Sequence, residues 1–332
     1  MADKGLKVAI IGAGMAGILA GIKLREQARH EFVIYEKADR IGGTWRENTY
    51  PGLTCDVPSH HYTYSFERNP DWSRHLPPGG EIQQYFERTC EKYGIYPHIR
   101  FGEELAQAEF RQGRWHLQMR SGRRDEVDVV IAATGVLHHP NMPSIPGAET
   151  FRGALFHSSR WDHSVDLQDK RIGVIGNGST GVQIVSALAG RVKHISHFQR
   201  TAQWIMPVEN GYFSEAEKAR FREDPAALEA AMDINTYRAN VEGYSQVITG
   251  QNGDGAQYFI ESCTNNLETS VADPALREKL RPDHAPLCKR LIFSPDYYDA
   301  IQHPAAALVT DGIAQIRQTV SAAAMAHFTR WT

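Results

Sequence analysis

The chain has 332 residues, of which 42% are hydrophobic, and this length allows about two domains, each with its own core. Its 36 basic and 39 acidic residues leave a formal net charge of -3, which excludes the one-signed surface that attracts nucleic acid or an anionic membrane. Four widely spaced cysteines without a CxxC pair, and the lack of an HExxH motif, predict a cytoplasmic protein with no disulfide framework, no redox dithiol and no metal site, and nothing indicates a protein partner.

A strand, a glycine-rich turn and a helix are predicted at the start of the chain. Lys7–Ile11 is a short apolar run, the sequence GAGMAG at residues 12–17 follows at once, and Ile18–Arg29 has apolar residues at helical spacing. The next predicted strand, Glu31–Glu36, ends in an acid. This order of elements is typical of a dinucleotide-binding unit.

Each glycine of such a turn has a physical role. Gly12 permits the sharp turn, Gly14 lets backbone N–H groups approach a pyrophosphate, and Gly17 lets the helix pack on the strand. The carboxylate of Glu36 can accept hydrogen bonds from a ribose 2′-hydroxyl. We therefore predict that these four residues bind one dinucleotide.

A loop rich in glycine, proline and aromatic residues follows at Ile41–Phe66. Taken singly, its aromatic residues would be explained as core residues. As a set the loop resembles the flavin and substrate loop of Baeyer-Villiger monooxygenases, which are class B flavoprotein monooxygenases. The matching residues are Gly42, Gly43, Trp45, Tyr50, Pro51, Gly52 and Asp56. The resemblance implies that FAD is bound by Gly43, Thr44, Trp45, Asp56 and Tyr62, within a lining that extends to Glu47.

A proline-rich crossing at residues 139–146 follows a predicted strand, Val127–Ala132, and the sequence Ala-Thr-Gly. The run FRGALFHSSRWD comes next and matches the FxGxxxHxxxW(P/D) signature of the same family. Its fixed positions are Phe151, Gly153, His157, Trp161 and Asp162. Read from the residues alone, a histidine and bulky aromatics at a domain crossing suit a hinge or packing role as well as catalysis.

The strand, turn and helix are then repeated. Arg171–Ile175 is a predicted strand, GNGSTG follows at residues 176–181, and Val182–Leu188 begins a helix, so a second dinucleotide is implied. The residues predicted to hold it are Gly176, Gly178, Ser179, Thr180 and Gly181.

The strand after this helix, His194–Gln199, is not followed by an acid. Arg200 and Thr201 stand there instead, 19 residues after Gly181. A guanidinium binds phosphate with charge-assisted hydrogen bonds, whereas a carboxylate would repel a 2′-phosphate. The predicted electron donor is therefore NADPH rather than NADH.

A mostly helical pattern covers about residues 207–286, with helices predicted at Glu215–Arg222 and Pro225–Met232, and it resembles the helical insert of the family. Lys289 and Arg290 follow the insert. The resemblance implies that Lys289 joins Arg200 and Thr201 at the 2′-phosphate, and that Arg290 faces the flavin with Asp56 beside it. Without the resemblance, the two residues would be a dibasic surface pair.

The activity implied by the resemblance is an NADPH-dependent oxygen insertion. A C4a-peroxyflavin formed from reduced FAD and O2 attacks a small-molecule ketone to give an ester or lactone. By the same resemblance Arg290, held by Asp56, stabilises the peroxide anion and the anionic adduct that it forms with the ketone. N- or S-oxidation of an amine or sulfide is the enzymatic alternative, although the related enzymes usually carry Tyr or Phe in place of Trp161. An inactive nucleotide-binding fragment is the alternative of another class.

The predicted fold is α/β, with two Rossmann-like dinucleotide-binding domains. Residues 1–140 form the N-terminal part of the FAD domain, 141–168 the signature-bearing linker, and 169–332 the NADP domain with its insert. The resemblance runs to about Ile316, after a strand at Ala307–Thr310. Arg317–Thr332 is alanine-rich and lacks the second Ala-Thr-Gly strand, so the FAD domain is expected to be incomplete at its C-terminus.

Overall fold

The structure is a computed structural model that describes residues 5–318, 320–323 and 328–330. The chain divides into two compact units. Unit 1 contains residues 1–49, 64–69 and 79–140, and unit 2 contains residues 50–63, 70–78 and 141–332. Two loop segments that precede residue 140 therefore fold with the later part of the chain.

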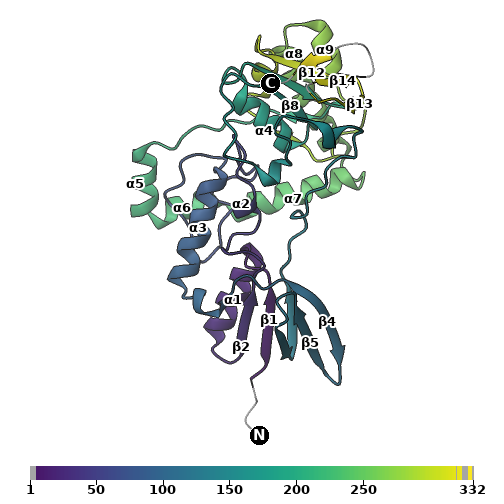
Figure 1. Cartoon of the computed structure of the whole chain (residues 1–332). Coiled ribbons are helices and arrows are strands. Elements are labelled where there is room, and N and C mark those ends of the chain that lie inside the picture. Colours follow the sequence, from purple (N-terminus) through teal and green to yellow (C-terminus); the bar gives the residue numbers. More distant parts are fainter. Residues whose placement is uncertain (1–4, 319, 324–327, 331–332) are drawn as a thin grey trace. The chain divides into compact units, whose positions relative to one another are not determined.

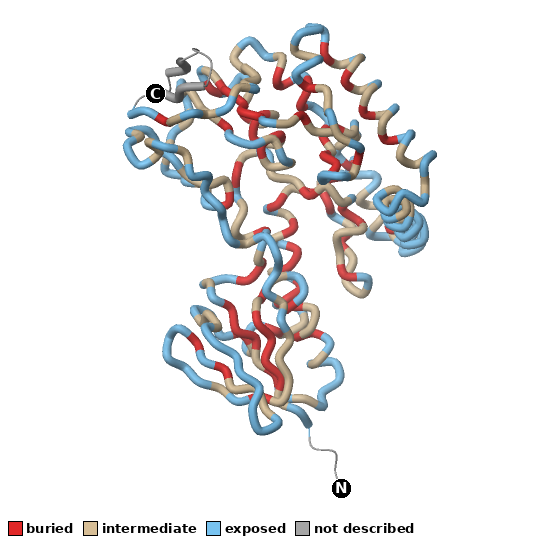
Figure 2. Tube along the Cα trace, turned by 90° about the vertical axis from the view of Figure 1, so that its right-hand side faces the viewer, coloured by how far each residue is buried: buried red, intermediate tan, exposed pale blue. Residues whose placement is uncertain are grey.

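Unit 1 is built on a parallel sheet with the strand order β3-β2-β1-β7. The strands are β1 (Lys7–Ile11), β2 (Glu31–Tyr35), β3 (Ile99–Arg100) and β7 (Val129–Ala132), and helix α1 (Met15–Gln27) connects the first two (Figure 1). The helix begins three residues earlier than predicted, because the end of the glycine turn already has helical hydrogen bonding. The buried residues of this sheet lie mostly in β1 and β2 (Figure 2).

Helix α3 of unit 1 is amphipathic. Its buried residues Ile82, Tyr85, Phe86, Thr89 and Cys90 recur at helical spacing, so one apolar face packs inward. The other elements of the unit include a three-stranded antiparallel sheet. They are α2 (Thr44–Glu47), α3 (Gly79–Lys92), η1 (Tyr96–His98), β4 (Leu105–Arg111), β5 (Arg114–Met119) and β6 (Arg124–Val127).

Unit 2 repeats the parallel arrangement with the strand order β12-β9-β8. Its strands are β8 (Arg171–Ile175), β9 (His194–Phe198) and β12 (Ala306–Val309), with α4 (Ser179–Leu188) after the turn and α10 (Tyr297–Ile301) packed on α4. Within the described residues, β8 pairs only with β9, whereas β1 lies between β2 and β7. The two parallel sheets confirm the predicted α/β class with two Rossmann-like units.

The segment predicted as a helical insert contains five helices, and a side-chain cap begins each of them. Ser214 and Glu217 form a reciprocal capping box, and Asp224 caps the helix that follows. The other elements of unit 2 that precede α10 are η2 (Ala148–Thr150), η3 (Ser158–Arg160), β10 (Ile205–Met206), α5 (Glu215–Glu223), α6 (Pro225–Met232), α7 (Ile234–Ile248), α8 (Gly253–Ser270), α9 (Pro274–Leu280) and β11 (Ile292–Phe293).

The end of the chain forms short strands that its composition did not predict. β13 (Ile313–Ile316), β14 (Val320–Ala323) and β15 (Phe328–Arg330) make an antiparallel sheet. Alanine disfavours strands, so the alanine-rich sequence alone gives no sign of this ladder. None of the helices in the described part of the chain has both the length and the apolar composition needed to cross a bilayer.

The glycine turn of unit 1 can be tested by adding one methyl group. In Gly17→Ala the new Cβ would lie 1.8 Å from the carbonyl oxygen of Gly12, so the turn must open. We expect the free energy of unfolding to fall by about 2 kcal/mol or more, measured by urea denaturation. The control is Gly80→Ala in α3, where a Cβ meets nothing within 4 Å and helix propensity should add about 0.4 to 1 kcal/mol. Equal midpoints for the two variants would contradict this account.

Candidate functional site

The first glycine turn lies at the carboxyl end of β1. Gly12 has φ +103° and its N–H donates to the carbonyl of Tyr35, while Gly14 precedes the first turn of α1. Gly17 is buried where the helix crosses the turn. The open N–H groups of the helix N-terminus are thus held beside the strand end, which is an anion-binding arrangement.

Glu36 lies directly after β2 and is only 5% exposed. One carboxylate oxygen accepts the N–H of Ala13 at 2.8 Å, and the other accepts the N–H of Ala38 at 2.9 Å and contacts Arg46 at 3.4 Å. The predicted ribose ligand therefore also holds the turn. A carboxylate can accept about four hydrogen bonds, which leaves capacity for a ribose hydroxyl.

The segment after Glu36 returns to the same turn. Gly43 has φ +55°, and a Cβ on it would lie 3.2 Å from the Cα of Gly14. Gly43 is followed by the short helix α2, which contains Thr44 and the buried Trp45. The structure therefore brings the predicted residues of unit 1 together around one turn.

In unit 2, the loop at residues 50–56 is tied to helix α4. The hydroxyl of Tyr50 donates to the side chain of Gln183 at 2.9 Å and accepts from Thr180 at 3.3 Å. The amide of Gln183 donates to both oxygens of Thr54 at 3.1 Å. Gly52 has φ +81°, and its Cβ would lie 2.5 Å from the carbonyl of Gln183, so the loop lies directly against the helix.

Asp56 at the end of this loop pairs with Arg290. Oδ2 of Asp56 accepts from Nη2 at 2.5 Å and from Nε at 3.1 Å. The hydrogen bond to Asp56 raises the pKa of Arg290, so the guanidinium is always charged. The aspartate side chain is 16% exposed and the arginine side chain 71% exposed, which leaves part of the cation accessible. The structure therefore places together two residues that are 234 positions apart in the sequence.

The second glycine turn has the geometry of the first. Gly176 has φ +103°, Gly178 precedes α4, and Ser179 and Thr180 form the first turn of the helix. A Cβ on the buried Gly181 would lie 2.0 Å from the carbonyl oxygen of Gly176. All five predicted residues therefore lie at one helix N-terminus.

The residue at the strand end beside this turn is one position earlier than the sequence analysis placed it. The N–H of Gly176 donates to Phe198, as that of Gly12 does to Tyr35, so Gln199 rather than Arg200 is the counterpart of Glu36. Sequence reasoning missed Gln199, which is buried and accepts from the side chain of Asn177 at 3.0 Å.

Three residues predicted for the 2′-phosphate lie on loops of unit 2. Arg200 directly follows Gln199 and is exposed, and Lys289 is exposed beside Arg290. The carbonyl of Thr201 accepts from the side chain of Asn177 at 2.8 Å, which ties this loop to the second turn. Tyr62, predicted to line the flavin, also lies in unit 2, and its N–H donates to the carbonyls of Pro58 and Ser59.

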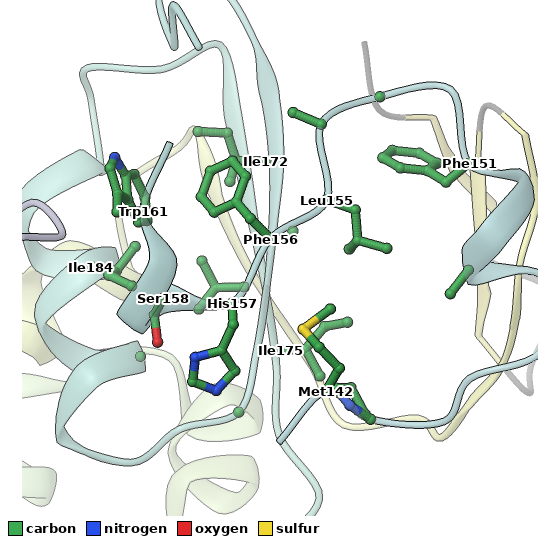
Figure 3. Close-up of a pocket in the computed structure, with 18 of the residues that line it drawn as sticks. Met142, Phe151, Leu155, Phe156, His157, Ser158, Trp161, Ile172, Ile175 and Ile184 are labelled. Atoms are coloured by element: carbon green, nitrogen blue, oxygen red, sulfur yellow. The ribbon is translucent and has the colours of Figure 1, made fainter. Parts of the chain in front are cut away.

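Four of the five signature residues, all except Asp162, line a pocket of about 670 Å³ in unit 2. Phe156 and Trp161 are in edge contact with centroids 5.2 Å apart, and they lie on one side of the pocket while Phe151 lies on the other (Figure 3). Strand β8 and the second glycine turn form further parts of its wall. Gly153 and His157 also line it.

The polar members of the signature make local contacts. Nδ1 of His157 accepts the N–H of Ser159 at 3.1 Å and so caps η3. Asp162 is exposed and accepts both the hydroxyl and the N–H of Ser164, which lowers the pKa of its carboxyl. Within the described residues there is no group of three or more His, Cys, Asp or Glu side chains that could hold a metal ion.

Comparisons with known proteins agree with this geometry. The model of the flavin-binding monooxygenase-like family matches residues 5–221. The chain is 46% identical over 306 residues to an uncharacterized monooxygenase of Mycobacterium tuberculosis, covering 92% of this chain and 61% of the relative. It is 36% identical over 323 residues to a Baeyer-Villiger monooxygenase of Streptomyces coelicolor, covering 96% of this chain and 61% of that protein.

The solved structures point to the same group. Cyclohexanone monooxygenase from Rhodococcus sp. Phi1, in a crystal structure bound to NADP+, matches with a TM-score of 0.83 and 26% identity. The match covers 99% of this chain and 69% of that structure. The chain thus spans about three fifths of the length of the curated relatives named above.

Thiol reactivity provides a test of the burial around this site. Burial raises the pKa of Cys55, Cys90 and Cys263 to about 12, so at pH 8 only about one in 10⁴ of each is the reactive thiolate. Cys288, beside Lys289, is exposed. In the parent protein we expect Ellman's reagent to label one thiol rapidly at pH 8 and all four in denaturant. In Cys288→Ser we expect it to label none rapidly at pH 8. Rapid labelling of Cys288→Ser would show that the buried assignments are wrong.

Proposed function

The chain belongs to the flavin-binding monooxygenase-like family, and from this premise we propose that it is an FAD- and NADPH-dependent monooxygenase that inserts one oxygen atom of O2 into a ketone. The family confirms the resemblance stated from the sequence. The observation that carries the proposal is the Asp56–Arg290 pair, which belongs to the same compact unit as the second glycine turn. The cysteines of the chain are free, which is consistent with a cytoplasmic enzyme.

The residues present fit the two nucleotide cofactors. Both turns have a glycine at which a Cβ would collide with the backbone, and both aim a helix N-terminus at the strand end. The first turn, with Glu36, suits FAD. The second lacks an acid and has Arg200 next to Gln199, which suits NADPH. When bound, these groups supply hydride transfer and the activation of O2.

Arg290 supplies the electrostatic part of the proposed reaction. A ketone carbonyl that is attacked by a nucleophile develops negative charge on its oxygen, and a fixed guanidinium stabilises that charge without having to reorganise. Asp56 holds the guanidinium through two hydrogen bonds, and the loop of Asp56 is in turn tied to α4. The arginine is therefore the catalytic residue and Asp56 its positioning residue.

Two other functions are outcomes of the same test. Oxidation of an amine or sulfide would use the same cofactors, and a chain that binds nucleotides without turning over would be a binding fragment. The purified chain is reconstituted with FAD and its visible absorption is recorded. NADPH consumption is then compared with a cyclic ketone, a tertiary amine and a sulfide. Bound flavin with ketone-dependent ester formation supports the proposal, and ketone-independent consumption with amine oxidation contradicts it.

The role of Arg290 can be separated from cofactor binding. We expect Arg290→Ala to retain flavin reduction by NADPH but to lower ester formation by at least about 10². The matched control is Arg222→Ala, because Arg222 also pairs with an aspartate, Asp71, in unit 2. Stopped-flow absorbance measures flavin reduction, and gas chromatography measures the ester. Parent rates of ester formation in Arg290→Ala would remove it from the mechanism.

Cofactor preference tests the second turn. In Arg200→Ala we expect the KM for NADPH to rise about tenfold or more, because one charge-assisted contact to phosphate is lost, while the KM for NADH stays nearly unchanged. Initial rates with both donors measure the difference. An equal rise for both donors would mean that Arg200 does not recognise the 2′-phosphate.

A further inference from the structure

His197 lies in the middle of the unit 2 sheet and is entirely buried, with 0% exposure. It belongs to β9, and its ring lies beneath the second glycine turn. Nε2 is 3.1 Å from the carbonyl oxygen of Gly176, and Nδ1 is 3.0 Å from the hydroxyl of Tyr297 in α10. A polar ring in a strand interior thus connects the second glycine turn to helix α10.

The contacts of this ring fix its protonation state. A carbonyl oxygen only accepts, so Nε2 carries the hydrogen and donates it to Gly176. Nδ1 then accepts from the hydroxyl of Tyr297. Burial lowers the pKa of His197 to about 4, and burial also raises the pKa of Tyr297, so both groups are neutral near pH 7. The imidazole is therefore an uncharged donor aimed at the turn.

In unit 1 the corresponding peptide group is held at its N–H end instead of its carbonyl end. The hydrogen bonds from Gly12 to Tyr35 and from Gly176 to Phe198 make Ile34 the counterpart of His197. Ile34 has no polar group, and the turn there is held by the carboxylate of Glu36, which accepts the N–H of Ala13. The carbonyl of a glycine and the N–H of the next residue belong to one planar peptide unit. Fixing either end therefore fixes the plane.

We propose that His197 is a positioning residue that anchors the second glycine turn through the carbonyl of Gly176, and so replaces the carboxylate that anchors the first turn. This proposal rests on the proposed function for the identity of the nucleotide. Its consequence is electrostatic: the turn stays rigid without a negative charge at the strand end, where a carboxylate would repel a 2′-phosphate. His197 thereby makes a phosphate-bearing nucleotide compatible with an ordered turn.

Three variants test this by rebuilding the arrangement of unit 1 in unit 2. In His197→Ile we expect the Kd of both NADP+ and NAD+ to rise about tenfold, the loss expected for one buried hydrogen bond. In Gln199→Glu we expect weaker NADP+ binding with NAD+ largely retained. In the double variant, the carboxylate takes over the anchoring, so NAD+ affinity should return to that of Gln199→Glu while NADP+ stays weak.

Isothermal titration measures these affinities. The donation from Gln199 to the carbonyl of Lys279 is lost equally in the single and double Gln199→Glu variants, so comparing them isolates His197. Unchanged binding in His197→Ile overturns the proposal. So does a double variant in which NAD+ binding is no tighter than in His197→Ile, because that result indicates packing alone.

Hydrogen exchange gives a readout that needs no nucleotide. In His197→Ile we expect the amides of residues 176–179 to exchange at least about fivefold faster, while those of residues 12–15 keep their parent rates. Gln199→Glu added to His197→Ile should slow the exchange again. Unchanged exchange overturns the proposal. A parent chain that binds neither nucleotide counts against the proposed function, whereas the exchange rates still decide the role of His197.

Discussion

The close approach of a helix to one carbonyl oxygen is the constraint on which both nucleotide units depend. In unit 1 this oxygen belongs to Gly12 and leaves no space for a Cβ on Gly17, and in unit 2 the oxygen of Gly176 does the same to Gly181. The helix can cross the turn only where a side chain is missing, and this crossing brings its N-terminal N–H groups to the end of the strand. The anion-binding character of each unit follows from that contact.

The two turns satisfy this constraint with different charges around them. In unit 1 a buried carboxylate accepts backbone N–H groups and is balanced by Arg46. In unit 2 the same position carries Gln199, whose amide donates to one backbone carbonyl and accepts from Asn177. The described residues of unit 2 include no buried aspartate or glutamate, so a neutral turn followed by Arg200 is electrostatically compatible with an additional phosphate. One backbone geometry is thus compatible with two different charges at the strand end.

Local spacing predicted both turns, because a strand, three glycines and a helix leave a fixed pattern in the sequence. It did not predict Gln199. The strand residue that accepts from the first glycine, Phe198, comes 22 residues after Gly176, whereas Tyr35 comes 23 residues after Gly12. The connection in unit 2 is therefore one residue shorter, which counting along the sequence cannot detect. The Asp56–Arg290 contact came from the family resemblance, because no local pattern relates residues so far apart. The placement of residues 50–63 with unit 2 depends on tertiary hydrogen bonds and left no sequence signal.

Helix α4 connects the nucleotide turn of unit 2 to the exposed cation. Its first turn carries Thr180, which donates a hydrogen bond to the hydroxyl of Tyr50. Its second turn carries Gln183, which accepts a hydrogen bond from that hydroxyl and donates one to Thr54. These contacts fix the loop that ends in Asp56, and Asp56 fixes the guanidinium of Arg290. A shift of α4 relative to this loop would break several hydrogen bonds of partly buried groups at once, each with a net value of about 1 kcal/mol. The position of the cation is therefore set by the same helix that presents its N–H groups to a nucleotide.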